Sequence, residues 1–249
     1  MTIDPLFDFT GKTVLITGAT RGLGYEMVKA FALRGADIVI SSRKQESCEE
    51  VAEEVRAIGR KALACSCHVG DWNDVERLTE AAYAEFGKVD VLINNAGMSP
   101  VTPNSLDVTE DLFDKVISVN FKGAFRLSAL IGQRMAEAGS GCIINVSSSG
   151  ARRPLANAIP YCGAKAALNA MTEGFAAEFG RFGVRVNTLS AGPFLTDISK
   201  AWSEDQRKRI PSPIGRPGNP DEVVTTALYL ASPASTYVTS CLARVDGGF

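Results

Sequence analysis

The sequence predicts an α/β fold in which helices cover both faces of one parallel sheet. Two observations support this. Seven short apolar runs rich in β-branched residues recur along the 249 residues, and a helical pattern follows each of the first six. Runs that are apolar at nearly every position are typical of strands buried on both faces, and right-handed crossovers between such strands give a doubly wound sheet.

The predicted elements alternate through most of the chain. Strands are expected at 13–17, 37–41, 61–65, 89–94, 142–147, 184–189 and 241–245. Helices are expected at 22–33, 45–58, 72–86, 109–138, 158–179 and 220–231. Glycines stand where four helices should end, a place that favours a left-handed residue: Gly35, Gly59, Gly87 and Gly183.

One stretch interrupts the alternation. Residues 193–220 carry five prolines around a short polar helical patch at 199–209. Long connections are usually functional, so we expect a substrate loop or lid here; the alternative is a surface loop without a role. Because no repeat, low-complexity tract or linker marks a boundary, we predict a single domain over residues 1–249.

The composition argues against several classes of protein. The chain is 45% hydrophobic and 22% charged, with a net charge of -2, so it offers no basic surface for nucleic acid or anionic lipid. No apolar run reaches membrane-spanning length, and residues 1–10 lack the features of a signal peptide. Six cysteines are scattered through apolar segments, which favours reduced thiols in a cytoplasmic protein.

A glycine-rich turn joins the first predicted strand directly to the first helix. Its sequence is Thr17-Gly-Ala-Thr-Arg-Gly-Leu-Gly24. A helix N-terminus presents unpaired N–H groups and the positive end of the backbone dipole, which together favour a phosphate. Gly18 permits the tight turn, and Gly22 and Gly24 let the backbone approach a pyrophosphate. Taken alone, three glycines are equally compatible with an ordinary turn.

The other predicted strands also end in small or polar residues, at 42–43, 68–69, 94–97, 147–149 and 190–192. Ligands of open α/β sheets bind outside the carboxyl ends of the strands. We therefore expect the site at this edge of the sheet, assembled from residues far apart in the sequence.

Tyr161 and Lys165 are the strongest candidates for acid–base chemistry, because they lie four residues apart and share a helix face. A nearby ammonium favours the phenolate and lowers the pKa of a tyrosine. Ser148 ends the fifth strand beside this helix and could hold a substrate oxygen. In isolation, Tyr161 and Lys165 could also be a surface pair, and Asn120 could be a helix residue that bonds its own backbone.

Together these motifs resemble those of the short-chain dehydrogenase/reductase family over essentially the whole chain. In order they are Thr17-Gly-x-x-x-Gly-x-Gly24, Asn94-Asn-Ala-Gly97, Asn120, Ser148 and Tyr161-x-x-x-Lys165. The resemblance implies a single-domain, Rossmann-like, doubly wound sheet of seven parallel strands with helices on both faces. It also implies hydride transfer between a nicotinamide cofactor and a carbonyl or secondary alcohol.

The resemblance further implies a role for each site residue. Tyr161 would be the general acid in reduction and the base in oxidation, and Ser148 would orient the carbonyl. Lys165 would lower the pKa of Tyr161 and bind the nicotinamide ribose, while Asn120 would hold a water in a relay to Lys165. The expected cofactor contacts are Gly18, Thr20, Arg21, Gly22, Leu23, Gly24, Ser42, Arg43, His68, Val69, Asn95, Ala96, Gly97, Tyr161, Lys165, Gly192, Phe194 and Thr196.

The second strand ends in a way that favours NADP(H) over NAD(H). An acidic residue near this point bonds the ribose 2′-hydroxyl of NAD, whereas an arginine accommodates the 2′-phosphate of NADP. Here Arg43 follows the strand, Arg21 precedes Gly22, and no acid occurs before Glu46. The alternatives are that both arginines are solvated, or that Arg43 forms a local ion pair with Glu46.

Two positions depart from the family pattern. His68 precedes Val69 where the family often carries an aspartate that bonds adenine, which puts that contact in doubt. Residues 191–193 are Ala-Gly-Pro where Pro-Gly is usual, although Thr196 still matches. Cys65, Cys67 and His68 suggest a metal site, but strand alternation separates them and no fourth ligand is visible, so we predict no metal.

The substrate pocket is expected at 98–101, 149–159 and 194–202, with an apolar wall that suits a small carbonyl or alcohol. Arg152 and Arg153 could meet an anionic group or face solvent. Alternative functions are a 3-oxoacyl-[acyl-carrier-protein] reductase, an NAD-dependent alcohol dehydrogenase and a non-catalytic dinucleotide-binding module; the last is disfavoured because Tyr161 and Lys165 are both kept. The resemblance implies a homotetramer or homodimer.

Overall fold

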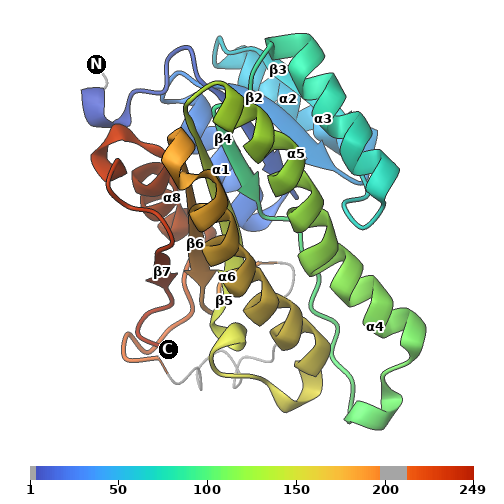
Figure 1. Ribbon diagram of the computed structural model, residues 1–249. Helices are drawn as coiled ribbons and strands as arrows, with labels where there is room; N and C mark the ends of the chain where they lie inside the picture. The colour runs from blue at the N-terminus through green and yellow to red at the C-terminus, as the bar shows by residue number, and fades with distance from the viewer. Residues whose placement is uncertain (1–3, 197–211) are drawn as a thin grey trace.

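The computed structural model describes residues 4–196 and 212–249 and contains one seven-stranded parallel sheet in the order β3-β2-β1-β4-β5-β6-β7 (Figure 1). This confirms the predicted doubly wound α/β fold. The strands are β1 (Thr13–Thr17), β2 (Asp37–Ser42), β3 (Ala62–Ser66), β4 (Val91–Asn94), β5 (Gly141–Ser148), β6 (Val184–Ala191) and β7 (Leu242–Val245).

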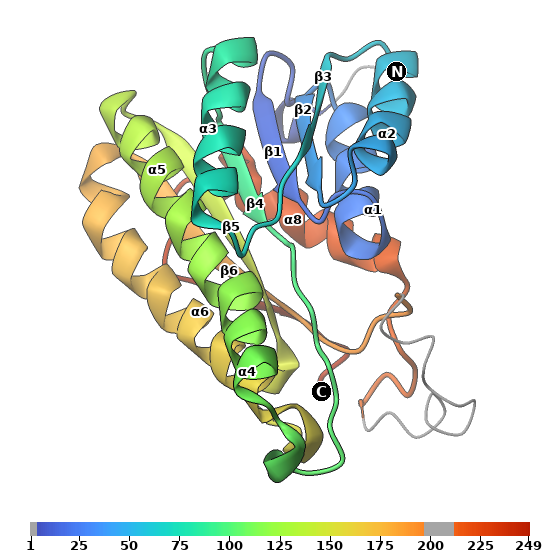
Figure 2. The ribbon, with the colours of Figure 1, turned by 90° about the vertical axis from the view of Figure 1, so that its right-hand side faces the viewer.

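Helices cover both faces of the sheet, and Figure 2 shows the two layers on either side of it. On one face lie α1 (Gly22–Ala32), α2 (Gln45–Ala57) and α8 (Val224–Ala231). On the other lie α3 (Trp72–Phe86), α5 (Gly123–Glu137) and α6 (Ile159–Phe179), with α4 (Glu110–Ile117) before α5. Because neighbouring strand residues point to opposite faces, Ile16 packs into the first layer and Leu15 into the second. Among the described helices none combines the length and apolarity needed to cross a bilayer.

The strand order places the crevice of the sheet beside β1. Thr17 of β1 pairs with Ser41 of β2 on one side, and Ile16 pairs with Ile93 of β4 on the other. The chain therefore leaves the ends of β1 and β4 in opposite directions. Such a reversal opens a crevice at the carboxyl ends of the strands, which is where dinucleotides bind in doubly wound sheets.

The predicted helix at 109–138 is wrong in one respect, because it is interrupted. After α4 the chain makes a π-helical segment, Ser118–Lys122, before α5 begins. This segment contains Asn120 and carries it into the protein interior. A π-helical turn adds one residue to the helical repeat and is frequent at functional sites.

The other differences lie at element ends. The expected strand at 89–94 begins only at Val91, and the last helix begins with a short 3₁₀ turn, Pro220–Val223. The left-handed glycines are confirmed, with φ angles of 72° at Gly87 and 80° at Gly183. The helical patch at 199–209 lies outside the described residues, so the loop or lid at about 193–220 and the single domain over 1–249 stay predictions.

Candidate active site

A cavity of about 1110 Å³ lies at the carboxyl ends of the strands, where the sequence placed the site. It is lined by every residue of the predicted cofactor and catalytic sets except Gly24 and Asn120. Residues from all three predicted substrate segments line it as well, within 98–100, 149–155 and 194–196. Positions 197–202 of the third segment lie outside the described residues.

The glycine turn is shaped by close backbone approach. A Cβ atom on Gly24 would lie 2.2 Å from the Gly18 carbonyl oxygen, and one on Gly18 would lie 2.9 Å from the Cα of Ala96. Gly18 also has a φ of 63°, in the left-handed region. Helix α1 begins at Gly22, and the side chain of its N-cap residue makes no capping hydrogen bond. A helix start that faces a cavity fits the pyrophosphate of a dinucleotide.

Asn95 joins the glycine turn to the end of β4. Its Nδ2 donates to the carbonyl oxygens of Thr17 at 2.9 Å and Gly18 at 3.1 Å. The Thr17 hydroxyl in turn accepts the N–H groups of Asn95 and Ala96, each at 3.1 Å. These four bonds fix the two strand ends relative to one another, so the floor of the cavity is rigid.

The predicted 2′-phosphate end of the cavity is rich in cations. Arg21, Arg43 and Lys44 line it, and the Thr20 hydroxyl donates to Ser42 at 3.2 Å. Within the described chain neither Arg43 nor Lys44 pairs with Glu46, so the local ion pair considered from the sequence does not form. This end of the cavity therefore favours an anionic group.

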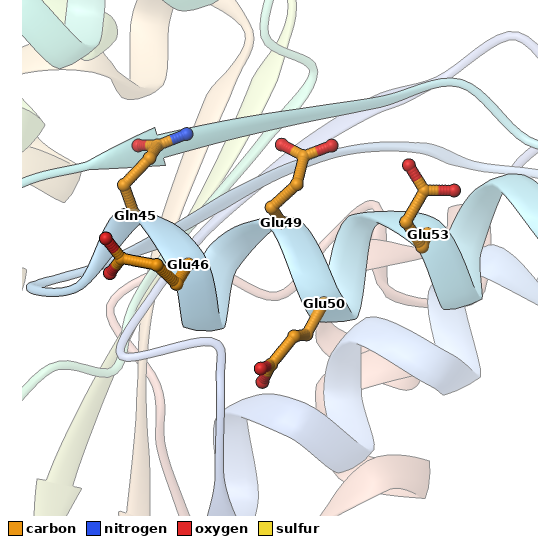
Figure 3. A pocket seen from close by; sticks show the side chains of 5 residues that line it. All are labelled: Gln45, Glu46, Glu49, Glu50 and Glu53. Atoms are coloured by element: carbon orange, nitrogen blue, oxygen red, sulfur yellow. The ribbon is translucent and has the colours of Figure 1, made fainter.

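The acidic residues of this region lie elsewhere. A second, open hollow runs along α2 and is lined by Gln45, Glu46, Glu49, Glu50 and Glu53 (Figure 3). Two of these carboxylates, Glu49 and Glu53, bind Arg56. A surface of four carboxylates repels phosphate, and none of the four lines the main cavity.

His68 lies at the mouth of the cavity with an exposed side chain. Its ring covers Gly70, where a Cβ atom would lie 2.9 Å from the imidazole Cε1. The His68 backbone N–H donates to the Asp74 carboxylate at 3.0 Å, and burial raises the pKa of the neighbouring Cys67 thiol to about 12. Within residues 4–196 and 212–249 no cluster of His, Cys, Asp and Glu could hold a metal ion.

Tyr161 and Ser148 meet on the substrate side of the cavity. Ser148 ends β5, its hydroxyl accepts the N–H of Gly150 at 3.1 Å, and its side chain is near enough to lower the pKa of Tyr161. Lys165 follows one turn later on α6 and is only 4% exposed. Its Nζ donates to the Val146 carbonyl at 2.8 Å and lies 6.0 Å from the centre of the Tyr161 ring. The three side chains therefore face one space, as the sequence predicted.

The pKa of Tyr161 differs from the sequence argument. Burial raises it, and the nearby Ser148 side chain only partly opposes this effect. The prediction that Lys165 lowers the pKa of Tyr161 is wrong for this geometry, because the ammonium donates to the Val146 carbonyl instead of the phenol oxygen. Burial also lowers the pKa of Lys165 to about 8. Tyr161 is therefore protonated at neutral pH, the state in which it can donate a proton.

The lowered pKa of Lys165 predicts a pH-dependent stability. Between about 8 and its ordinary 10.5, the unfolded chain holds the proton and the folded chain does not, so the free energy of unfolding rises with pH. Below this window both states are protonated, and the cost of burying the ammonium is fully present. Relative to Lys165→Met, we expect wild type to gain stability as pH rises, by at most about 1.4 kcal/mol per pH unit. Urea unfolding at about pH 7, 8.5 and 10 measures the difference, and a constant difference contradicts this assignment.

Asn120 lies behind the cavity wall. Its Nδ2 donates to the carbonyl oxygens of Met98 and Val116, both at 2.9 Å, and its Oδ1 accepts the Met98 N–H at 3.1 Å. The bond to Val116 is the local backbone contact considered from the sequence. Gly97 separates Asn120 from Lys165, since a Cβ atom there would lie 2.9 Å from Oδ1 and 3.6 Å from Nζ. Asn120 therefore braces the segment that lines the nicotinamide side of the cavity.

The lining residues missed from the sequence include Lys115, Val119 and Phe249. The first two come from α4 and the π-helical segment, and their spacing of four was the only available signal. Phe249 is held by its main-chain oxygen, which accepts from Arg152 and from Arg244, the latter at 2.7 Å. No local pattern predicts this contact, because it depends on how the segment after β7 packs.

The geometry agrees with comparisons to known proteins. A family model described as Enoyl-(Acyl carrier protein) reductase matches residues 18–249. A D-threitol dehydrogenase from Mycolicibacterium smegmatis is 34% identical over 253 aligned positions, which cover 100% of this chain and 96% of that protein.

Solved structures match over nearly their whole length. A short-chain type dehydrogenase/reductase from Mycobacterium marinum has a TM-score of 0.91 at 32% identity, covering 98% of this chain and 97% of that one. A gluconate 5-dehydrogenase from Burkholderia cenocepacia, in complex with NADP and tartrate, has a TM-score of 0.94 at 30% identity, with 98% and 97% covered. A 7α-hydroxysteroid dehydrogenase in complex with NADH and a 7-oxo bile acid has a TM-score of 0.93 at 31% identity, with 100% and 98% covered.

Proposed function

The chain belongs to the short-chain dehydrogenase/reductase family, and from this premise we propose that it is an NADP(H)-dependent oxidoreductase that uses Tyr161 as general acid and base. The observation that carries the proposal is the single cavity in which Tyr161 and Ser148 share a wall with the glycine turn at the start of α1. When bound there, the dinucleotide supplies or accepts the hydride at its nicotinamide ring.

In the proposed reduction, the substrate carbonyl oxygen lies between the hydroxyls of Ser148 and Tyr161. Ser148 holds this oxygen by a hydrogen bond, and Tyr161 gives it a proton as negative charge develops. In the reverse direction Tyr161 takes the proton from the alcohol. Lys165 lies one helical turn away with its ammonium bonded to the Val146 carbonyl, and it lines the same cavity, where it would bind the ribose next to the nicotinamide. Asn120 positions the segment around Gly97 and thereby supports Lys165.

A preference for NADP(H) is supported by charge. Among the described residues, the end of the cavity near β2 is lined by Arg21, Arg43 and Lys44 and by no carboxylate. A 2′-phosphate carries charge that such a site can pair, whereas the 2′-hydroxyl of NAD lacks its usual acidic partner here. The two related structures named above contain NADP in one case and NADH in the other, so the preference rests on these residues.

Replacing Arg43 with glutamate should reverse this preference. We expect the affinity for NADPH to fall by about 10- to 100-fold while the affinity for NADH changes by less than about threefold, because only NADPH carries the paired phosphate. Fluorescence titration of both nucleotides with wild type and Arg43→Glu measures the change. Arg60→Gln is the matched control, since Arg60 pairs with Asp37 and does not line the cavity. Equal losses for both nucleotides would remove Arg43 from the phosphate site.

The substrate we propose is a small carbonyl compound or secondary alcohol. A 3-oxoacyl-[acyl-carrier-protein] reductase is the second candidate, favoured by the carrier-protein description of the matching family model. A panel of ketones, with one 3-oxoacyl thioester, distinguishes the two by oxidation of NADPH. We further propose that the protein is a cytoplasmic homotetramer or homodimer. Helices α5 and α6 could form the interface, because Phe125 is 40% exposed and its ring centre lies 5.6 Å from that of Phe175.

A further inference from the structure

We propose that the substrate carries a carboxylate, and that Arg153 binds it while Ser148 and Tyr161 hold the reacting oxygen. The proposal deepens the proposed function and rests on it. It begins with the charge of the cavity. Among the described residues the cavity lining includes six cationic side chains and no aspartate or glutamate; the cations are Arg21, Arg43, Lys44, Lys115, Arg153 and Lys165.

These cations fall into separate groups along the cavity. Arg21, Arg43 and Lys44 lie at the ends of β1 and β2, where the phosphates of a dinucleotide are expected. Lys165 is buried and held by Val146. Arg153 and Lys115 come instead from the segments after β5 and before the π-helical turn, on the substrate side. A dinucleotide accounts for the first group, and the second group, which is exposed, is available to a separate anion.

Arg152 and Arg153 are neighbours with different surroundings. Arg152 donates to the Phe249 main-chain oxygen and lies 3.6 Å from the Asp246 carboxylate, and it does not line the cavity. Arg153 lines the cavity, and its guanidinium carbon lies over the Phe249 ring, 5.5 Å from the ring centre. No acidic side chain of residues 4–196 or 212–249 pairs with it. The structure therefore shows that Arg153 lines the cavity and Arg152 does not, a difference that the sequence could not reveal.

Arg153 is also fixed relative to the reacting groups. The Arg153 backbone N–H donates to the Ser149 carbonyl at 2.9 Å, which places this backbone one short 3₁₀ turn from Ser148. A guanidinium held over an aromatic ring keeps N–H donors that can bind a carboxylate in two parallel hydrogen bonds. Lys115 adds positive potential without a described acidic partner.

The other residues that line the substrate side of the cavity indicate what carbon skeleton the substrate has. Met98, Val119 and Leu155 line the cavity here together with Phe249. An apolar stretch between a polar reacting end and a cationic end fits a hydroxy or oxo carboxylic acid with a short carbon chain between the two groups.

The test compares oxo carboxylic acids with their primary amides, across chain lengths of about one to four carbons between the groups, at saturating NADPH. For wild type we expect kcat/KM for the acid to exceed that for the matched amide by about 10- to 100-fold. Arg153→Gln should remove this advantage, mainly through a higher KM for the acid, so that kcat/KM for the acid and for the amide become nearly equal. Lys115→Gln should reduce the advantage by a smaller factor.

Arg181→Gln serves as the charge-matched control. Arg181 follows α6 at the end opposite Tyr161 and stacks only on Phe182, so its loss should leave acid selectivity unchanged. If wild type oxidises NADPH with the amides or with neutral ketones as well as with the acids, the carboxylate inference is wrong and the proposed function stands. If the protein binds NADPH but turns over none of the acids, the carboxylate inference is also wrong. A protein that binds neither nucleotide overturns the proposed function itself.

Discussion

Replacing Tyr161 with phenylalanine is expected to lower kcat/KM for any carbonyl substrate by about a thousandfold, with NADPH affinity changed by less than about threefold. The variant keeps the aromatic ring and removes only the hydroxyl, which lines the cavity with Ser148. Without it no group in the described site is placed to give a proton to the oxygen held by Ser148. Binding is retained because the glycine turn, Asn95 and the cations near β2 are untouched.

Tyr237→Phe is the matched control, because that side chain is fully exposed and does not line the cavity. Steady-state oxidation of NADPH measures turnover, and fluorescence titration measures binding for both variants. Activity of Tyr161→Phe within about tenfold of wild type would contradict the acid–base role. Loss of nucleotide binding together with activity would show that the hydroxyl instead maintains the cofactor site.

Replacing Gly24 with alanine is expected to distort the glycine turn of the nucleotide site, although Gly24 itself does not line the cavity. The new methyl group would lie 2.2 Å from the Gly18 oxygen and 2.6 Å from the Asn95 Nδ2, so the turn must move. We expect the free energy of unfolding to fall by about 1–3 kcal/mol, as for other overpacked sites, and NADPH affinity to fall by at least about tenfold. Urea unfolding and fluorescence titration measure the two effects.

Gly174→Ala makes the same chemical change where there is room for it. Gly174 lies within α6, and an added Cβ atom there meets nothing within 4 Å. Alanine is a better helix former than glycine, so this control should gain up to about 1 kcal/mol and bind NADPH as wild type does. Wild-type nucleotide binding by Gly24→Ala would contradict the close approach at the turn.

The sequence predicted the sheet well because each of the first six strands is short, apolar and followed by a helical pattern. Buried parallel strands carry a composition that needs no tertiary information, as at Val14-Leu15-Ile16. The interrupted helix at Ser118–Lys122 was missed for a physical reason. One extra residue in a helical turn leaves apolar periodicity almost unchanged over so short a stretch.

The site was predictable to the extent that its residues stand at strand ends. Tyr161 and Lys165 could be placed because one helix carries both, and Ser148 because it ends β5. Lys115 and Phe249 could not, since their positions depend on how separate segments pack in three dimensions. The pKa of Tyr161 was predicted in the wrong direction because spacing along a helix does not reveal where an ammonium directs its hydrogen bond.

The most direct test of the proposed function is a fluorescence titration of the purified protein with NADPH and with NADH. The cavity at the start of α1, with Arg21 and Arg43 at one end, predicts saturable binding of both nucleotides and binding of NADPH that is tighter by about 10-fold or more. Tighter binding of NADH would contradict the role of the two arginines. Binding of neither nucleotide would contradict the assignment of this cavity as the site of hydride transfer.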